Sequence, residues 1–151
     1  MKSKLIKFLA VSLASMSLAA CNQHVDPAPE DVYVEEIKII LPEQTLDIED
    51  RSETKDGKTE YEFSTHFNEN GGEGITVVLK AEVYPTNTSF KRVEVVTDEQ
   101  EEGVEPMYTV NIVDMYYIHV HFNTSARAKF AVQSTDGNKL QVPVTIFALP
   151  S

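Results

Sequence analysis

The chain has one cysteine, no tryptophan and few basic residues, and two of these scarcities exclude a class of protein. A single cysteine cannot close a disulfide within the chain, which excludes a small domain held together by internal disulfides. Only 13 lysines and arginines stand against 24 aspartates and glutamates, and the formal net charge is -11. Phosphate contacts need clustered lysine and arginine, so we expect no nucleic-acid partner.

The motifs of common catalytic chemistries are also missing from the sequence. There is no Gly-x-Ser-x-Gly motif for a serine nucleophile, and no zinc motif that carries a glutamate. The glycines at 71, 72 and 74 lack the lysine and the following helix of a phosphate-binding loop. We therefore predict a protein that is not an enzyme and that holds no cofactor and no metal.

The first 21 residues have the pattern of a secretory signal. Three lysines (Lys2, Lys4 and Lys7) precede or interrupt an apolar stretch over 5–18, which is too short for a stable membrane span. Small residues then lead to Cys21. Removal of the three lysines with the signal would change the net charge from -11 to -14. Such a charge is repelled by an anionic membrane surface.

The stretch Leu18-Ala19-Ala20-Cys21 resembles the lipobox of bacterial lipoproteins. The resemblance implies that residues 1–20 are a lipoprotein signal peptide and that Cys21 carries the lipid that anchors the protein to a membrane. Two or three acyl chains anchor a protein stably, because each buried methylene contributes about 0.8 kcal/mol. The alternative is an ordinary signal peptide with a thiol near its cleavage site.

The resemblance also implies a location in the bacterial cell envelope. Asn22 stands where an aspartate would retain the protein at the inner membrane, so the outer membrane is the expected site where the host has one. Residues 21–31 contain two prolines and few large apolar residues, and we predict a lipidated cysteine followed by a flexible tether.

From residue 32 onward apolar and polar residues alternate with the period of a strand, and no window predicts a helix. The alternation slips at Glu35-Glu36, which predicts a bulge. Pro143 predicts that the last strand is an edge strand or is bulged. The strands are expected over 32–41, 61–67, 77–83, 91–97, 108–112, 117–122, 128–133 and 142–146, with a short continuation at 45–48.

These strands predict one all-β domain over 32–151, an immunoglobulin-like β-sandwich of about 7–9 strands. Asp56-Gly57 and Asp136-Gly137 are turn signals, and residues 50–72 are expected to form an extra hairpin or an extended loop. The apolar faces of the strands should be buried between the two sheets. The residues expected there are Val77, Leu79, Ala81, Val83, Phe130, Val132, Val144 and Ile146.

The stretch from Gly74 to Ile146 resembles the bacterial immunoglobulin-like domain, group 2. The resemblance rests on Val83-Tyr84-Pro85, on Lys91-Arg92-Val93 and on the strand 128–133 with its Asp-Gly turn. The chain departs from the family pattern in having no tryptophan at 93–96. The resemblance implies a sandwich used at bacterial surfaces for adhesion, spacing or carbohydrate-associated modules, and no catalytic residues.

Exposed aromatic residues are the best indication of a binding face. Alternation places Tyr117, His119 and His121 on one side of a strand, and Tyr84 and Tyr116 are further candidates for a patch that binds a sugar or a protein. The alternative is that these tyrosines cover the edge of the sandwich. The two histidines are a plausible metal pair, but zinc needs three or four ligands, with His66 or an acid as the third, and a solvated aromatic stripe is the expected interpretation.

The sequence thus favours a lipid-anchored envelope lipoprotein that acts as a non-enzymatic interaction, adhesion or structural module. Its partners would be the membrane, through the lipid on Cys21, and an envelope protein or a glycan. The second hypothesis is a carbohydrate-binding accessory lipoprotein that uses the tyrosine and histidine face.

Overall fold

The computed structural model describes residues 30–97 and 106–151. The signal, Cys21, most of the tether and the acidic stretch 98–105 lie outside the described residues. Residues 31–151 form one compact unit. Among the described residues, no helix has the length and the apolar character needed to cross a membrane.

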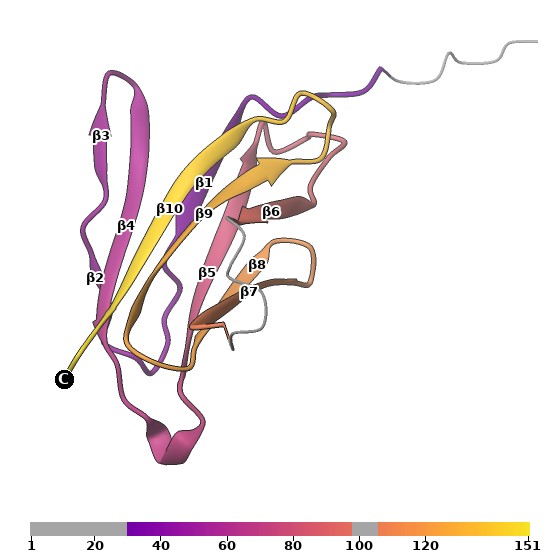
Figure 1. Cartoon of the computed structure of the whole chain (residues 1–151). Coiled ribbons are helices and arrows are strands. Elements are labelled where there is room, and N and C mark those ends of the chain that lie inside the picture. The colour runs from indigo at the N-terminus through magenta and orange to yellow at the C-terminus, as the bar shows by residue number, and fades with distance from the viewer. Residues whose placement is uncertain (1–29, 98–105) are drawn as a thin grey trace, which may run out of the picture. The chain divides into compact units, whose positions relative to one another are not determined.

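The first layer is a four-stranded antiparallel sheet (Figure 1). In its central strands apolar and polar residues alternate, so the apolar side chains face the core and the polar side chains face solvent. The order of the strands is β1 (Glu36–Ile40), β5 (Ile75–Tyr84), β8 (Tyr117–Phe122) and β7 (Tyr108–Val113).

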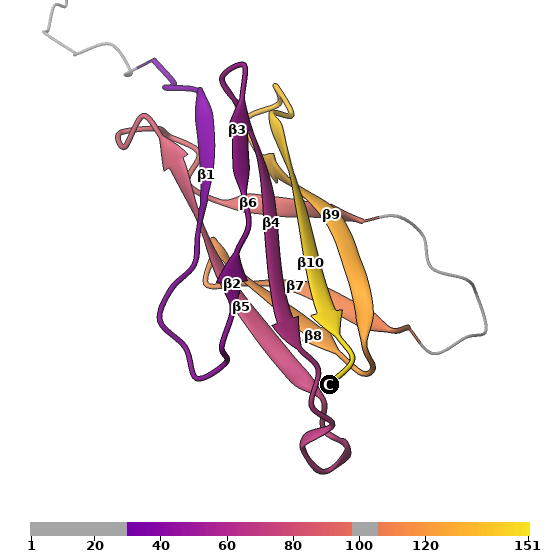
Figure 2. The same ribbon diagram turned by 90° about the vertical axis from the view of Figure 1, so that its left-hand side faces the viewer.

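The second layer is a six-stranded sheet that packs against the first (Figure 2). Its members are β2 (Glu49–Asp50), β4 (Lys58–His66), β10 (Gln141–Leu149), β9 (Ala126–Ser134) and β6 (Val93–Thr97), in that order, with β3 (Glu53–Lys55) paired to β4. All pairs are antiparallel except β4 with β10, which run parallel.

This arrangement confirms the predicted all-β immunoglobulin-like sandwich. One sheet holds β1, β5, β8 and β7. From β5 onward the chain changes sheet between β5 and β6, between β6 and β7 and between β8 and β9, as in immunoglobulin-type sandwiches. The described residues form ten strands, because the short β2 and β3 add to the number expected.

The core lies between the two sheets and follows the predicted alternation. Seven of the eight residues predicted to be buried are buried, and Leu79, Val77, Val132, Val144 and Ile146 have no exposed surface. Val83 is only half-buried, because β8 pairs with β5 no further than Lys80 and leaves the end of β5 uncovered. The sequence pattern gives the face of a residue but not where the neighbouring strand ends.

The β3–β4 hairpin matches the expected insertion at 50–72 only in part. Asp56 and Gly57 both have positive φ (54° and 77°), as a two-residue hairpin turn requires. The second half of β4 is not an insertion: Phe63 is buried in the core, and the strand pairs with β10 from Tyr61 onward. Toward the hairpin turn β4 diverges from β10 (Figure 1). A 3-10 turn (Asn70–Gly72) then leads to β5.

Two local predictions were wrong. Residues 45–48 are not a strand. β10 is not an edge strand, because it lies between β9 and β4. Pro143 is tolerated there because Ser134 N–H donates to Leu140 O, and the alternation of the ladder then places Pro143 at a position without a hydrogen bond to β9. Pairing with β4 begins only at Val144.

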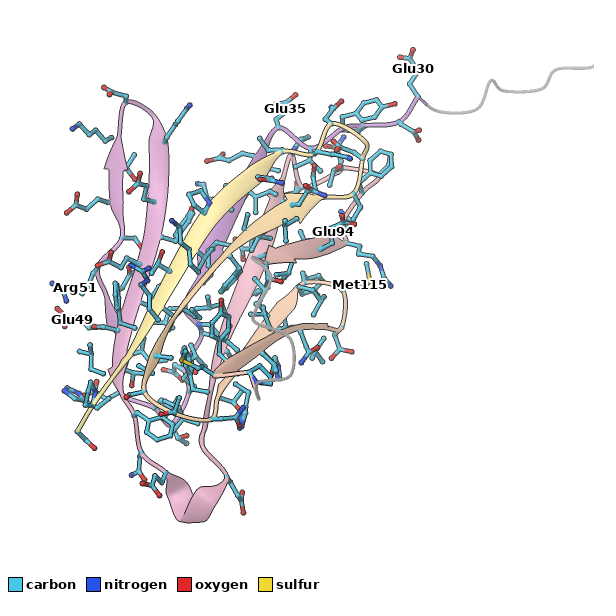
Figure 3. The ribbon with its side chains drawn as sticks, viewed as in Figure 1. Glu30, Glu35, Glu49, Arg51, Glu94 and Met115 are labelled. Atoms are coloured by element: carbon cyan, nitrogen blue, oxygen red, sulfur yellow. The ribbon has the colours of Figure 1, made fainter. Side chains whose placement is uncertain are left out.

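The entry of the chain into the sandwich is fixed by side chains from two loops. Val34 N–H donates to Asp136 Oδ2 at 2.8 Å, and Val32 O accepts from Thr88 Oγ1 at 2.6 Å. Glu35 and Glu36 both lie opposite Tyr84, and Val34 and Ile37 are both buried, which agrees with the predicted slip. Figure 3 shows Glu35 at this end of β1, projecting from the sheet.

Asp136 is buried, and burial by itself would raise its pKa. Hydrogen bonds from Val34 N–H, the Ser134 hydroxyl and Asn138 N–H outweigh that effect and hold the pKa of Asp136 below its ordinary value. The carboxylate therefore joins the β9–β10 turn to the beginning of the domain, 102 positions away in the sequence.

Candidate functional site

The predicted face lies on the outer surface of the four-stranded sheet, but it divides into two parts. Tyr117, His119 and His121 follow one another along β8, and all three are half-buried. Tyr84 lies at the other end of β5, beyond the last β8 pairing, and Tyr116 lies in the β7–β8 turn.

The histidine part is a row of polar contacts between strands. His121 Nδ1 lies 2.8 Å from Thr76 Oγ1 of β5, and His119 is aligned with Val78 and Asn111. His66 belongs to the other sheet, where it pairs with Leu149. Across 30–97 and 106–151 no group of three or more His, Cys, Asp or Glu side chains is placed to hold a metal ion.

The tyrosine part is connected by a chain of side-chain contacts that we call the tyrosine–lysine network. Its members are Lys38, Tyr84, Glu82, Lys80, Tyr116 and Tyr117. Alternation puts the β1 and β5 members on the same outward face. Lys80, Glu82 and Lys38 were not predicted as site residues, although Lys80 and Glu82 share the polar face of their strand with Tyr84.

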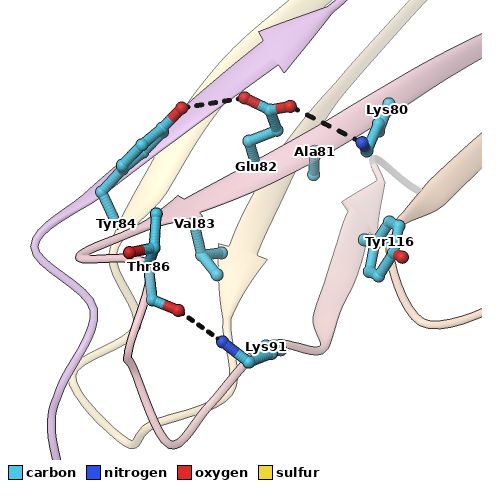
Figure 4. A pocket seen from close by; sticks show the side chains of 8 residues that line it. All are labelled: Lys80, Ala81, Glu82, Val83, Tyr84, Thr86, Lys91 and Tyr116. Atoms are coloured by element: carbon cyan, nitrogen blue, oxygen red, sulfur yellow. Dashed lines mark hydrogen bonds and ion pairs between the residues drawn. The ribbon is translucent and has the colours of Figure 1, made fainter.

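The network combines two cation–π contacts, one hydrogen bond, one ion pair and one contact between aromatic rings. The Tyr84 hydroxyl donates to Glu82 Oε1 at 2.8 Å, and Glu82 Oε2 lies 3.6 Å from Lys80 Nζ (Figure 4). Lys80 Nζ lies 5.6 Å from the centre of the Tyr116 ring. The hydrogen bond to Glu82, partial loss of solvent and the charges of Glu82 and Glu36 raise the pKa of Tyr84.

Beside the network lies a pocket of about 270 Å³, the β5-end pocket (Figure 4). It brings Tyr84 and Tyr116 to one site, so the structure joins these two predicted residues and separates them from His119 and His121. Lys91 Nζ donates to Thr86 O at 2.6 Å and so closes the rim of the pocket. The pocket is lined by Lys80, Ala81, Glu82, Val83, Tyr84, Thr86, Lys91 and Tyr116.

The pocket exists because of the β7–β8 turn. Asp114 and Met115 have positive φ, and Tyr116 N–H turns back to Asp114 O at 2.9 Å instead of continuing the ladder. Tyr116 O still accepts from Ala81 N–H at 2.8 Å, and Met115 O accepts from Val93 N–H of the other sheet at 3.1 Å. The turn thus fixes Tyr117 as the first residue of β8. Beyond Lys80, which pairs with Tyr117, β5 continues without a neighbouring strand on the side away from β1.

A second hollow of about 410 Å³ lies on the outer face of the other sheet, between the β3–β4 hairpin and β10. It is lined by charges of both signs, and Glu53 lies directly opposite Glu60 across the hairpin, a like-charge pair that weakens strand pairing. Its lining residues are Arg51, Glu53, Glu60, Tyr61, Glu62, Lys129, Pro143 and Thr145.

Comparisons of the chain with models of protein families, with curated proteins and with solved structures find no match. The geometry of the two outer faces is therefore the basis for assigning a function.

Proposed function

We propose that the protein is a lipid-anchored lipoprotein of the bacterial cell envelope that acts as a non-enzymatic binding module. The anchor would be a lipid on Cys21, supported by the lipobox-like Leu18-Ala19-Ala20-Cys21. The resemblance to bacterial immunoglobulin-like domains agrees with the observed sandwich, which such modules use as a scaffold.

The observation that carries the binding role is the β5-end pocket with its network. Aromatic, cationic and anionic side chains meet there at a hollow in the sheet, and the contacts among Tyr84, Glu82 and Lys80 hold them in place. Concave sites with a few oriented polar groups are the usual form of a binding site. Tyrosine is also enriched among the residues that dominate protein interfaces.

A protein partner fits this site better than a glycan. Sugar stacking needs a free aromatic face, but Lys80 Nζ lies over the Tyr116 ring and Tyr117 packs against the same ring at 5.3 Å. The aromatic lining of the pocket nevertheless supports carbohydrate binding as the second candidate. In that case, glycan-array binding should be lost in Tyr84→Ala and Tyr116→Ala variants.

The anchor and the binding role are tested in cells that express the chain. Cys21→Ser should move the protein from the membrane fraction to the soluble fraction. A photoreactive residue in place of Thr86, at the rim of the pocket, should give a discrete cross-linked product with an envelope protein. The product should disappear when Tyr116→Ala is added and should not form from position Lys55 at the tip of the hairpin. Equal products from both positions would contradict the proposal.

A further inference from the structure

Where β5 passes the β5-end pocket, it pairs with β1 on one edge, but β8 no longer pairs with its other edge. Along β5, every second residue points its N–H and C=O away from β1. Ala81 is one of these residues, because its N–H donates to Tyr116 O. Val83, two positions on, therefore points its N–H and C=O the same way. Pairing with β8 ends at Lys80, so within 30–97 and 106–151 no strand faces the N–H and C=O of Val83, and no turn or loop residue bonds to them. Ala81 O is also left without Tyr116 N–H, which bonds to Asp114 O instead.

From this geometry we infer that the β5-end pocket receives a short extended segment of a partner protein, which adds to β5 beside Ala81 and Val83. The inference rests on the proposed binding function and names the mode of recognition and the class of partner. In strand addition, main-chain hydrogen bonds supply affinity and the side-chain sites supply specificity. Val83 N–H, Val83 O and Ala81 O are the three groups available.

The side chains around the unpaired stretch define the chemistry of the segment. Toward the core the pocket offers Val83, an apolar side chain that is only half-buried because β8 stops short. Covering Val83 would complete the core at this end. The residue of the added segment that faces inward is therefore apolar.

Toward solvent the same stretch offers ammonium groups. Lys91 Nζ contacts only a carbonyl oxygen, that of Thr86, and no carboxylate among the described residues pairs with it. Lys80 Nζ pairs with the one carboxylate that lines the pocket, that of Glu82. The pocket lining thus carries two ammonium groups and one carboxylate on a chain whose net charge is -11, and this local excess of positive charge complements a carboxylate. Because successive residues of a strand face opposite sides, the segment should alternate apolar and acidic residues.

The purified full-length protein is titrated with a capped seven-residue peptide of alternating valine and glutamate, and binding is followed by NMR and by amide hydrogen exchange. The Val83 amide should shift and exchange more slowly, while the amides of β10 stay unchanged. A matched peptide with lysine in place of glutamate should bind about tenfold more weakly. Equal binding of both peptides, or no change at Val83, would overturn the inference.

Two variants test the same contacts. Val83→Pro removes the free N–H but none of the β1–β5 hydrogen bonds, and it should abolish binding, whereas Val83→Thr keeps the N–H and should retain it. Lys91→Gln should weaken binding about five- to tenfold and reduce its dependence on salt. If Val83→Pro fails to fold, hydrogen exchange of the wild-type protein and the affinity of Lys91→Gln still test the inference. If the wild-type protein does not bind the peptide but still gives the Thr86 cross-link in cells, strand addition is refuted while the proposed binding role stands.

Discussion

Among the glycines that the structure describes, Gly74 is the one at which an added methyl group should have the largest effect. It has φ of 78° and immediately precedes β5. A Cβ at this position would overlap the backbone carbonyl oxygen of Phe122, and it would lie 3.2 Å from His121 Nε2. Phe122 pairs with Ile75, so the overlap falls on the first rung of the β5–β8 ladder.

The expected cost of Gly74→Ala has two parts. A residue with a Cβ in the left-handed region costs about 1–2 kcal/mol. Relief of the overlap requires a backbone shift in β5 or β8, and overpacking of this kind costs about 1–3 kcal/mol. The free energy of unfolding should therefore fall by about 2–5 kcal/mol in urea titration.

Gly57 provides the control, because its φ of 77° nearly equals that of Gly74 and no atom lies within 4 Å of its added Cβ. Gly57→Ala should show only the conformational part, about 1–2 kcal/mol. Equal losses in the two variants would refute the reasoning, because they would mean that the close approach to Phe122 contributes nothing. NMR spectra of the two variants would locate the backbone shift. Changes in the His121 and Thr76 resonances in Gly74→Ala but not in Gly57→Ala would place it at the β5–β8 pairing.

Leu79→Ala should reduce the free energy of unfolding by about 2–5 kcal/mol, because Leu79 has no exposed surface, and a change below about 0.5 kcal/mol would reject the assigned face. Asp136→Asn should destabilise the domain near neutral pH. Because the folded pKa of Asp136 is lowered, its contribution is present above the unfolded value of about 3.9 and is lost as pH falls through the folded value, so the variant should lose less stability than the wild type over that window. An identical pH profile in both proteins would contradict this role. Met115→Gly should stabilise the domain by about 0.5–1 kcal/mol, since Met115 has φ of 77° and points into solvent with 42% exposure (Figure 3). A lower melting temperature would show that its side chain makes a stabilising contact.

The elements whose alternation is regular were predicted correctly from the sequence. β5, β8 and β9 follow the expected faces, and Asp56-Gly57 forms the expected turn. These features depend on neighbouring residues in the chain, which is why a period or a dipeptide signals them.

Features that depend on distant pairing were not predictable. The period of β4 indicates a strand but not its parallel pairing with β10, and Pro143 is compatible with a central strand only because of the register with β9 and β4. Asp136 signals a turn, but nothing in its local sequence indicates the hydrogen bond to Val34.

The candidate site was predicted in part for the same reason. The aromatic residues Tyr84 and Tyr116 were identified by type, and the structure brings both to the β5-end pocket. His119 and His121 were grouped with them because they share a strand face, but they lie along the paired part of β8. Lys91 was not predicted, because it comes from a loop whose return to β5 is a tertiary feature.

The central claim is that an acylated Cys21 holds this sandwich on an envelope membrane. It is tested most directly by mass spectrometry of the N-terminal peptide of the protein isolated from its own cells. We predict a peptide that begins at Cys21 and carries the mass of a diacylglyceryl group on sulfur, with or without a further acyl chain on nitrogen. A peptide with a free Cys21 thiol, or one that retains residues before Cys21, would contradict the claim.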